Sequence, residues 1–315
     1  MKQAAVLSAG AVPGEKAGPA PRPRPLGQLS GKALERLMQL VFTLCGLVAV
    51  GFVLLITVYL ILSGIPAIRQ IGLLDFLFGR TWAAGQDQYG ILPLILTSVY
   101  GTAGAIVLGV PVGFFTAVSL AKVAPRPLAS LIRPAVFLLA GIPSVVYGLV
   151  GMCVLVPALR SWLNLPAGDS LLAAIIVLAV MILPSIISLS ETALEAVPKE
   201  YEEASLALGA TELETYFRVS ARAAKSGIAA AVVLGIGRAI GEAMAIMMVA
   251  GNVANMPALT NSVRFLTTGI SIELNYAADG SLQKQALFSI GLVLFLLIML
   301  INAFLNLVLK RDKEG

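Results

Sequence analysis

The sequence contains no histidine, only two cysteines and few charged residues. The absence of histidine excludes a histidine-ligated metal site and a Ser/His/Asp catalytic triad. Cys45 and Cys153 both lie in apolar runs, so a disulfide scaffold is not expected. Charged residues make up 12% of the 315 residues and apolar residues 58%, whereas roughly 25% of residues in soluble domains are charged. An ordinary soluble domain is therefore excluded.

Long apolar runs dominate the rest of the chain. Several exceed the ~18 residues that suggest a helix spanning a bilayer. The sequence therefore predicts an all-α membrane protein with six spans, at residues 38–62, 91–121, 134–157, 171–189, 227–250 and 286–309. The net charge of +5 is ascribed to Lys and Arg beside these spans and not to a nucleic-acid partner.

Lys and Arg are unevenly divided between the two sides of these spans. Sixteen of them lie on one side, in residues 1–37, 122–133, 190–226 and 310–315. Five lie in the three connections on the opposite side, and Arg238 lies within a span. By the positive-inside rule the side with sixteen Lys and Arg is cytoplasmic, so both termini are predicted to be cytoplasmic. The expected organisation is a disordered basic tail over 1–37, an extracytoplasmic loop over 63–90, a five-helix core over 91–309 and a cytoplasmic C-terminus over 310–315.

The fifth span carries two opposite charges near its middle. A lone Arg238 at that depth costs ~2.5–3.5 kcal/mol on insertion scales, so it must face a partner or a wet cavity. Glu242 is four residues further on, and in a continuous helix it shares the same face. One interpretation is an internal salt bridge that fixes packing. The other is anion handling, because a guanidinium is always charged and its planar fork suits tetrahedral oxyanions.

Residues 190–226 form the longest cytoplasmic connection and contain helix-capping signals. Pro198 suits the first turn of a helix, and Gly209 suits the left-handed residue beyond its end. Thr211 and Glu214 match a capping box that opens a second helix. Two short helices meeting at a glycine predict an elbow over 198–222, which from spacing alone is also compatible with an ordinary solvated hairpin.

The stretch EEASLALGA within this elbow resembles the loop motif of importer-type ABC permeases. Glu203, Ala204, Ser205 and Gly209 match that motif, with Ser in its third place. The resemblance implies that the elbow docks into a cleft of an ATP-hydrolysing subunit and transmits its closure to the membrane helices. The chain departs from the family at residues 221–222, where Ala-Arg stands in place of the usual Leu-Pro or similar pair.

Three further stretches resemble the permeases of phosphate importers, and among them the C-type subunit in particular. They are GIGRAIGEAMA followed by AGN, AGIPSVVYGLVG, and W-x6-YGILPLI from Trp82. The resemblance implies the type I ABC importer permease fold and a role for Arg238 and Glu242 in phosphate passage. It also implies a homologous permease partner, two copies of an ATP-binding subunit and an extracytoplasmic phosphate-binding protein, in a bacterial cytoplasmic (inner) membrane.

No nucleotide site of its own is expected in this chain. The sequence has no G-x-x-x-x-G-K-[ST] motif, so ATP and Mg²⁺ are expected on a partner ATPase. No catalytic or metal-binding residue is expected either, and the chain is predicted to be a transporter subunit and not an enzyme. The alternatives are the A-type partner permease, a permease for sulfate or molybdate, and an ATP-independent channel or scaffold.

Other polar residues carry weaker indications. Pro143 within the third span predicts a bend in that helix, which from periodicity alone is more typical of packing than of a path. Ser144 and Tyr147 are candidates for polar groups of the translocation path. The polar residues of the outer loops are expected to be solvated surface; they include Asp75, Asp87, Asn252 and Glu273.

Overall fold

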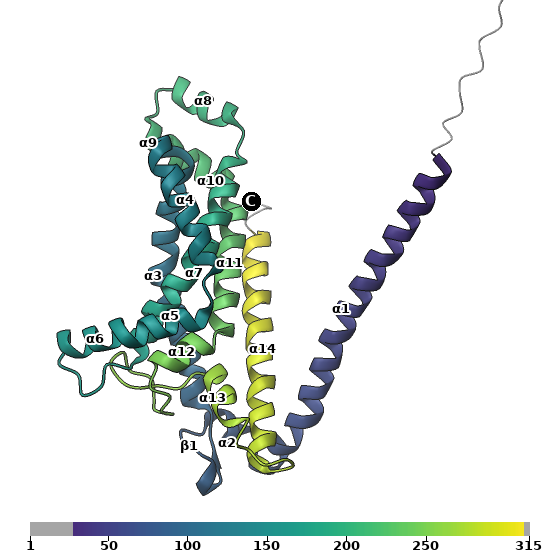
Figure 1. Cartoon of the computed structure of the whole chain (residues 1–315), viewed down its shortest axis with the longest axis vertical. Coiled ribbons are helices and arrows are strands. Elements are labelled where there is room, and N and C mark those ends of the chain that lie inside the picture. Colours follow the sequence, from purple (N-terminus) through teal and green to yellow (C-terminus); the bar gives the residue numbers. More distant parts are fainter. Residues whose placement is uncertain (1–27, 312–315) are drawn as a thin grey trace, which may run out of the picture. The chain divides into compact units, whose positions relative to one another are not determined.

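The computed structural model describes residues 28–311 of the chain, which are mostly helical (Figure 1). The elements, in chain order, are α1 (Gln28–Ile71), α2 (Leu73–Phe78), β1 (Trp82–Ala83), η1 (Ala84–Gln86), β2 (Gln88–Tyr89), α3 (Leu92–Val118), η2 (Ser119–Val123), α4 (Arg126–Gly141), α5 (Ser144–Val150), η3 (Gly151–Leu155), α6 (Val156–Trp162), α7 (Leu171–Glu195), α8 (Lys199–Ala207), α9 (Glu212–Thr215), η4 (Tyr216–Ser220), α10 (Ala221–Ala223), α11 (Lys225–Gly241), α12 (Met244–Val249), α13 (Leu266–Glu273) and α14 (Leu282–Arg311). The single sheet of the described residues is the antiparallel pair β1–β2.

The chain divides into two compact units, residues 1–55 and 56–315. In the first unit the described residues all belong to α1, and those from 34 to 55 are exposed. Large apolar side chains such as Phe42 and Phe52 need lipid or a partner around them. The helix includes residues 28–37, so the predicted disordered tail over 1–37 is wrong in that part, while residues 1–27 lie outside the described chain.

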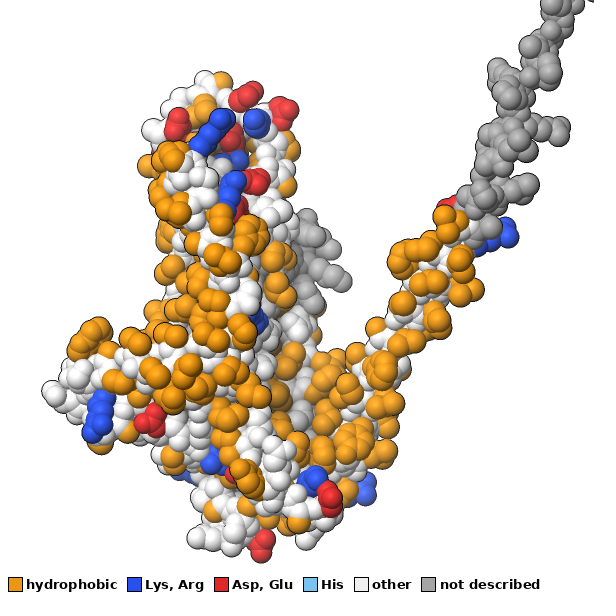
Figure 2. Space-filling model, viewed as in Figure 1, with side chains coloured by type: hydrophobic (Ala, Val, Ile, Leu, Met, Phe, Trp, Pro, Cys, Tyr) orange, Lys and Arg blue, Asp and Glu red, His pale blue; other side chains and the backbone are white. Residues whose placement is uncertain are grey.

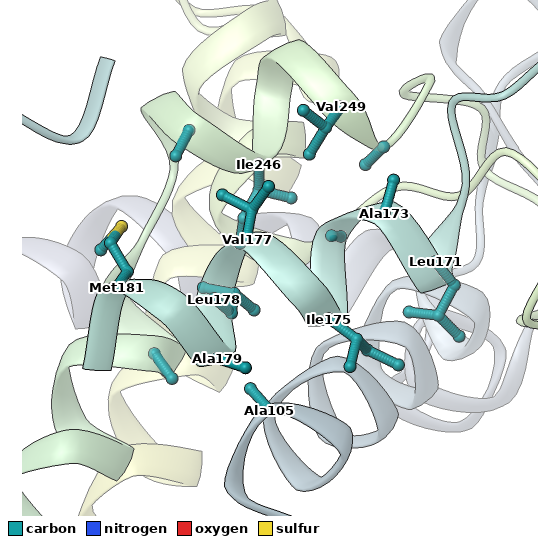
Figure 3. Close-up of a cluster of buried hydrophobic side chains, with 14 of the residues drawn as sticks. Ala105, Leu171, Ala173, Ile175, Val177, Leu178, Ala179, Met181, Ile246 and Val249 are labelled. Atoms are coloured by element: carbon teal, nitrogen blue, oxygen red, sulfur yellow. The ribbon is translucent and has the colours of Figure 1, made fainter. Parts of the chain in front are cut away.

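The second unit is built around α7. Ser170 begins this helix, because its Oγ accepts a hydrogen bond from the Ala173 amide at 3.3 Å. α3, α7, α11 and α14 run side by side (Figure 1). The main core joins α7 to α3 and α12 (Figure 3), through side chains that include Ala105, Ile175, Leu178, Ile246 and Val249.

Glycines on α3 let α7 approach closely. A Cβ atom added to Gly109 would lie 2.9 Å from Ile182, and one added to Gly113 would lie 2.7 Å from Ile186. Each isoleucine therefore fills the space that a side chain on α3 would occupy. Close packing of this kind drives the association of helices in a bilayer, because lipid tails are as apolar as the side chains and no hydrophobic driving force brings the helices together.

The predicted number of spans agrees with the structure. Five helical segments of the described chain are long and apolar enough to cross a membrane, or up to six if the bent pair Glu212–Ala223 and Lys225–Gly241 is one span. The surface of the second unit shows charged side chains gathered toward its ends and a broad hydrophobic region between them (Figure 2). The chain is thus an all-α membrane protein, as predicted.

Two predicted spans are wrong in detail, because the helix breaks inside them. The span over 134–157 is divided at Ile142 and Pro143, where α4 ends and α5 begins. The span over 227–250 ends as a helix at Gly241 and resumes at Met244. The predicted extracytoplasmic loop over 63–90 is also helical as far as Ile71, and this part of α1 contacts α14 through a hydrogen bond from Ser289 Oγ to the Gly64 carbonyl at 2.7 Å.

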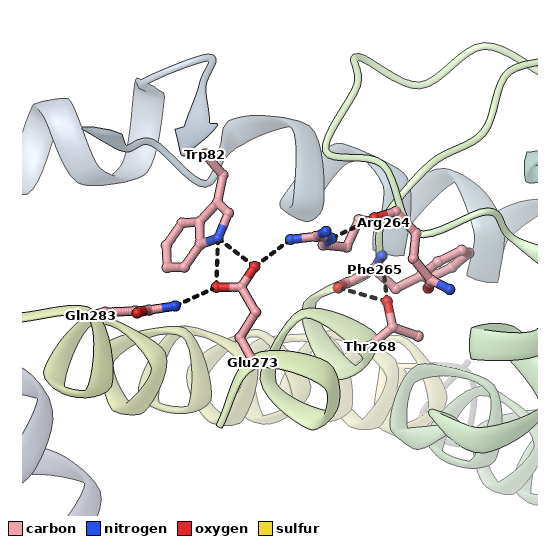
Figure 4. A network of polar contacts seen from close by, with 7 residues as sticks. Trp82, Arg264, Phe265, Thr268, Glu273 and Gln283 are labelled. Carbon is pink, nitrogen blue, oxygen red and sulfur yellow. Dashed lines mark hydrogen bonds and ion pairs between the residues drawn. The ribbon is translucent and has the colours of Figure 1, made fainter. Parts of the chain in front are cut away.

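A polar network ties together the end of the unit opposite the elbow (Figure 4). Glu273 accepts hydrogen bonds from Trp82 Nε1 at 2.9 and 3.0 Å, from Gln283 Nε2 at 3.1 Å and from Arg264 Nη1 at 2.5 Å. The expectation that Glu273 is solvated surface is wrong: its side chain is only 16% exposed, whereas Asp75 and Asp87 are exposed as expected. Three donors, one of them the cationic Arg264, offset the desolvation of this carboxylate.

The glycine contacts between α3 and α7 predict a stability effect. Gly113→Val places a branched side chain against Ile186, and overpacking of this kind destabilises by about 1–3 kcal/mol. We expect a lower apparent melting temperature of the detergent-solubilised chain. Gly46→Val is the matched control, because a Cβ at Gly46 meets no atom within 4 Å. Equal melting temperatures for the two variants would contradict this packing.

Candidate functional site

The break between α11 and α12 separates the two charges of the fifth span. Glu242 has φ −73° and ψ 132°, an extended conformation, so the helix does not carry it onto the face of Arg238. Among the ion pairs of the described residues, none joins these two side chains. The interpretation of an internal salt bridge along one continuous helix is therefore wrong, because its geometry requires i and i+4 to be helical neighbours.

Glu242 instead stabilises the break itself. Its Oε1 accepts a hydrogen bond from the Ala245 amide at 3.0 Å, which satisfies a free N–H at the start of α12. Its backbone carbonyl accepts a hydrogen bond from Thr267 Oγ1 of α13 at 2.7 Å. Non-helical backbone at membrane depth is tolerated only where such partners replace the missing helical hydrogen bonds.

Arg238 lies in the last turn of α11 and is half-buried. Its Nη1 donates to Ser185 Oγ of α7 at 3.4 Å. The guanidinium lines a pocket of 540 Å³ between α7, α11 and α14, whose other lining residues are Ser185, Val233, Leu234, Gly237 and Asn302. With a single long hydrogen bond to a neutral hydroxyl, the cation keeps most of its donors available to an incoming anion.

The helix that follows the break at Pro143 packs against the helix that follows the break at Glu242. Ile142 and Pro143 are extended, α5 begins at Ser144, and Tyr147 donates from its hydroxyl across the break to the Leu139 carbonyl at 2.6 Å. A Cβ on Gly148 would lie 2.8 Å from the Cα of Ala245, so α5 and α12 are in direct contact. The bend predicted from Pro143 is thus confirmed as a full interruption of the helix.

The structure does not bring the predicted path residues together in one pocket. Arg238 lines the pocket, whereas Ser144, Tyr147 and Glu242 are not among its lining residues. Sequence reasoning missed Ser185 and Asn302, which do line it. The sequence contains only weak indications of these two residues: Ser185 follows a proline inside a predicted span, and Asn302 is a polar residue in an apolar run.

The elbow has the predicted form. α8 begins after Pro198, and Gly209 beyond its end has φ +89°, the left-handed conformation that favours glycine. Thr211 and Glu214 form the capping box of α9. The chain then bends by 72° between residues 212–223 and 225–241. This bend is made at Ala224, directly after the Ala-Arg pair of residues 221–222.

The motif residues lie on the elbow with different exposures. Glu203, Ala204 and Gly209 are exposed, and Ser205 is half-buried, with its Oγ 2.8 Å from Thr215 Oγ1. The elbow also presents large apolar side chains to its surroundings, namely Tyr201, Leu206, Leu208 and Leu213. An exposed apolar group on a short polar hairpin is typical of a protein contact and not of a solvated face.

Glu202 anchors the elbow to the membrane helices. It pairs with Lys122 of η2 at 2.6 Å and accepts a hydrogen bond from Ser220 Oγ at 2.8 Å, and both charged side chains are largely buried. Burial raises the pKa of the Glu202 carboxyl, but the hydrogen bonds from Lys122 and Ser220 and the charge of Lys122 outweigh it, so the net pKa is below the ordinary value of 4.5.

This anchor makes the stability of the chain depend on pH. Because the folded pKa of Glu202 is lowered, its contribution is fully present above the ordinary pKa of 4.5 and is lost as the pH falls through the lower folded value. We expect Glu202→Gln to destabilise the elbow by about 1–3 kcal/mol at neutral pH. In thermal unfolding the difference from wild type should shrink on acidification. Glu203→Gln, at an exposed neighbour, is the control; an equal effect there would contradict the anchor.

Comparisons with known proteins agree with this architecture. The family model described as "Binding-protein-dependent transport system inner membrane component" matches residues 109–313. A probable ABC transporter permease protein, YqgH of Bacillus subtilis, is 37% identical over 84% of this chain and 88% of that protein. The phosphate transport system permease protein PstC of Haemophilus influenzae is 33% identical over 84% of this chain and 90% of that protein.

Solved structures show the same fold at lower identity. A chain of a bacterial alginate ABC transporter, crystallised with an alginate pentasaccharide-bound periplasmic protein, aligns with a TM-score of 0.62 and 15% identity over 91% of this chain and 97% of that chain. A chain of the MetNI methionine ABC transporter, in inward-facing conformations, aligns with a TM-score of 0.54 and 21% identity over 71% of this chain and 94% of that chain.

Proposed function

The chain belongs to the family of binding-protein-dependent transport system inner membrane components, and we propose that it is the C-type membrane subunit of an ATP-driven importer of inorganic phosphate. It is a permease subunit of an ABC transporter, an inner-membrane protein with several spans, and not an enzyme. The observation that carries the phosphate proposal is the Arg238 pocket, in which a permanent cation with free donors lies between three apolar helices.

Arg238 and Glu242 have different roles in this proposal. Arg238 attracts the oxyanion inside the membrane, where few other groups compensate the negative charge of the anion. Glu242 shapes the path by holding the break between α11 and α12 through its hydrogen bond with Ala245. On this proposal Tyr147 and Ser144, beside the neighbouring break, also contribute polar groups to the path. Discontinuous helices at mid-membrane sites are common in transporters, because their free backbone groups can contact the substrate.

The proposed partners follow from the exposed surfaces and from the relatives. A homologous permease covers apolar side chains that the chain leaves exposed on α4 and α5, such as Leu131 and Val145. Two copies of a cytoplasmic ATPase, which bind ATP and Mg²⁺, dock on the elbows through Glu203, Ala204, Ser205 and Gly209. An extracytoplasmic binding protein delivers phosphate. Both termini lie in the cytoplasm on this proposal, on the side where Lys122 pairs with Glu202 of the elbow and Arg133 pairs with Glu191 of α7.

A permease for another oxyanion is the main rival. It is favoured by one observation, namely that an arginine pocket recognises the oxygens of sulfate or molybdate as well as those of phosphate. Competition of labelled phosphate uptake by sulfate, molybdate and thiosulfate separates the two, because only the true substrate competes effectively. An ATP-independent channel would conduct ions without an ATPase and has no use for the elbow.

The central test replaces the arginine. Arg238→Gln keeps a polar side chain and removes the charge, so phosphate uptake by the assembled complex in proteoliposomes should fall by about 100-fold. Arg160→Gln is the matched control, since Arg160 is exposed and is not among the residues lining the pocket. Co-purification of the ATPase should be unchanged in both variants. Wild-type uptake by Arg238→Gln would exclude the proposed role.

A further inference from the structure

Two neutral side chains complete the Arg238 pocket. Ser185 comes from α7, next to Pro184, and Asn302 comes from α14, so each of the three helices contributes one polar group. The remaining lining residues are Val233, Leu234 and Gly237. Polar side chains facing one another inside a hydrophobic region are costly unless they bind each other or a ligand.

The contacts within the pocket leave these groups available. Asn302 has no hydrogen bond among those of the described side chains, and Ser185 receives only the 3.4 Å contact from Arg238. A fully satisfied structural network would contain short, mutual hydrogen bonds, as the Glu273 network does. The volume of 540 Å³ is many times the ~30 Å³ that one water occupies, so a partly hydrated oxyanion fits.

We propose that Ser185 and Asn302 are substrate-positioning residues that, with Arg238, form a transient binding site for the transported oxyanion. This inference rests on the proposed function of Arg238. Arg238 can only donate hydrogen bonds, whereas a hydroxyl and a carboxamide can both donate and accept. The set therefore matches hydrogen phosphate, which carries one O–H donor beside its acceptor oxygens.

The neutrality of these two groups also suits transport. A conducted ion must bind well enough to enter and weakly enough to leave. One cation with two neutral groups meets this condition better than a cluster of cations, which would retain the anion. The site is therefore a transient, low-affinity binding site on the path and not a high-affinity one.

The test uses initial uptake rates of the complete complex in proteoliposomes, with saturating binding protein and ATP. Ser185→Ala and Asn302→Leu should each lower the phosphate uptake rate about tenfold. Ser185→Thr keeps the hydroxyl and should retain most of the rate. Ser188→Ala, a half-buried serine on the same helix and outside the pocket, is the matched control and should transport like wild type.

A second variant tests the pocket without removing a polar group. Gly237→Val fills the space beside Arg238, and because a Cβ there meets no atom within 4 Å, folding should be preserved. Uptake should fall at least tenfold, while Gly51→Val, also open in the structure, should have no effect. Assembly is checked by co-purification of the ATPase.

The outcomes distinguish this inference from the proposed function. If wild type transports phosphate and the Ser185, Asn302 and Gly237 variants match it, the positioning role is overturned while the importer stands. If wild type transports sulfate or molybdate instead, phosphate import is overturned, and the same variants are measured with that anion. Loss of uptake in Ser185→Thr equal to that in Ser185→Ala would also contradict the hydroxyl's role.

Discussion

A permanently charged guanidinium inside an apolar protein is the constraint on which the rest of the structure depends. Burying such a charge near the centre of a bilayer costs ~2.5–3.5 kcal/mol or more unless water or a partner compensates it. In this chain no carboxylate among the described residues pairs with Arg238. The 540 Å³ pocket leaves room for water or an anion beside the guanidinium, which donates to one neutral side chain, Ser185, at 3.4 Å.

The two helix breaks are possible because their free backbone groups are satisfied locally. The Tyr147 hydroxyl binds the Leu139 carbonyl, Thr267 binds the Glu242 carbonyl, and the Glu242 carboxylate binds the Ala245 amide. These contacts join α5, α12 and α13 around the C-terminal end of α11, the helix that carries Arg238. At the other end, Glu202 and Lys122 attach the elbow to η2. This ion pair links the elbow to the segment that directly continues α3.

Much of this architecture is readable from the sequence, and the failures have physical causes. Apolar length predicts the spans, and caps at Pro198, Gly209 and Thr211 predict the elbow, because those signals are local. The break after Gly241 has no proline to mark it; it depends on Thr267, a residue distant in sequence. The pocket partner Asn302 and the network around Glu273 are likewise products of tertiary packing, which no local pattern contains.

The claim that Arg238 lies on an aqueous path is tested most directly by thiol accessibility at the adjacent glycine. Gly237→Cys, in a chain with Cys45 and Cys153 replaced by serine, is treated with a membrane-impermeant thiol reagent in complexes trapped facing inward and outward. The account predicts modification in at least one state, slowed by phosphate. A cysteine that stays unmodified in both states would contradict it, because the charge would then be sealed from water.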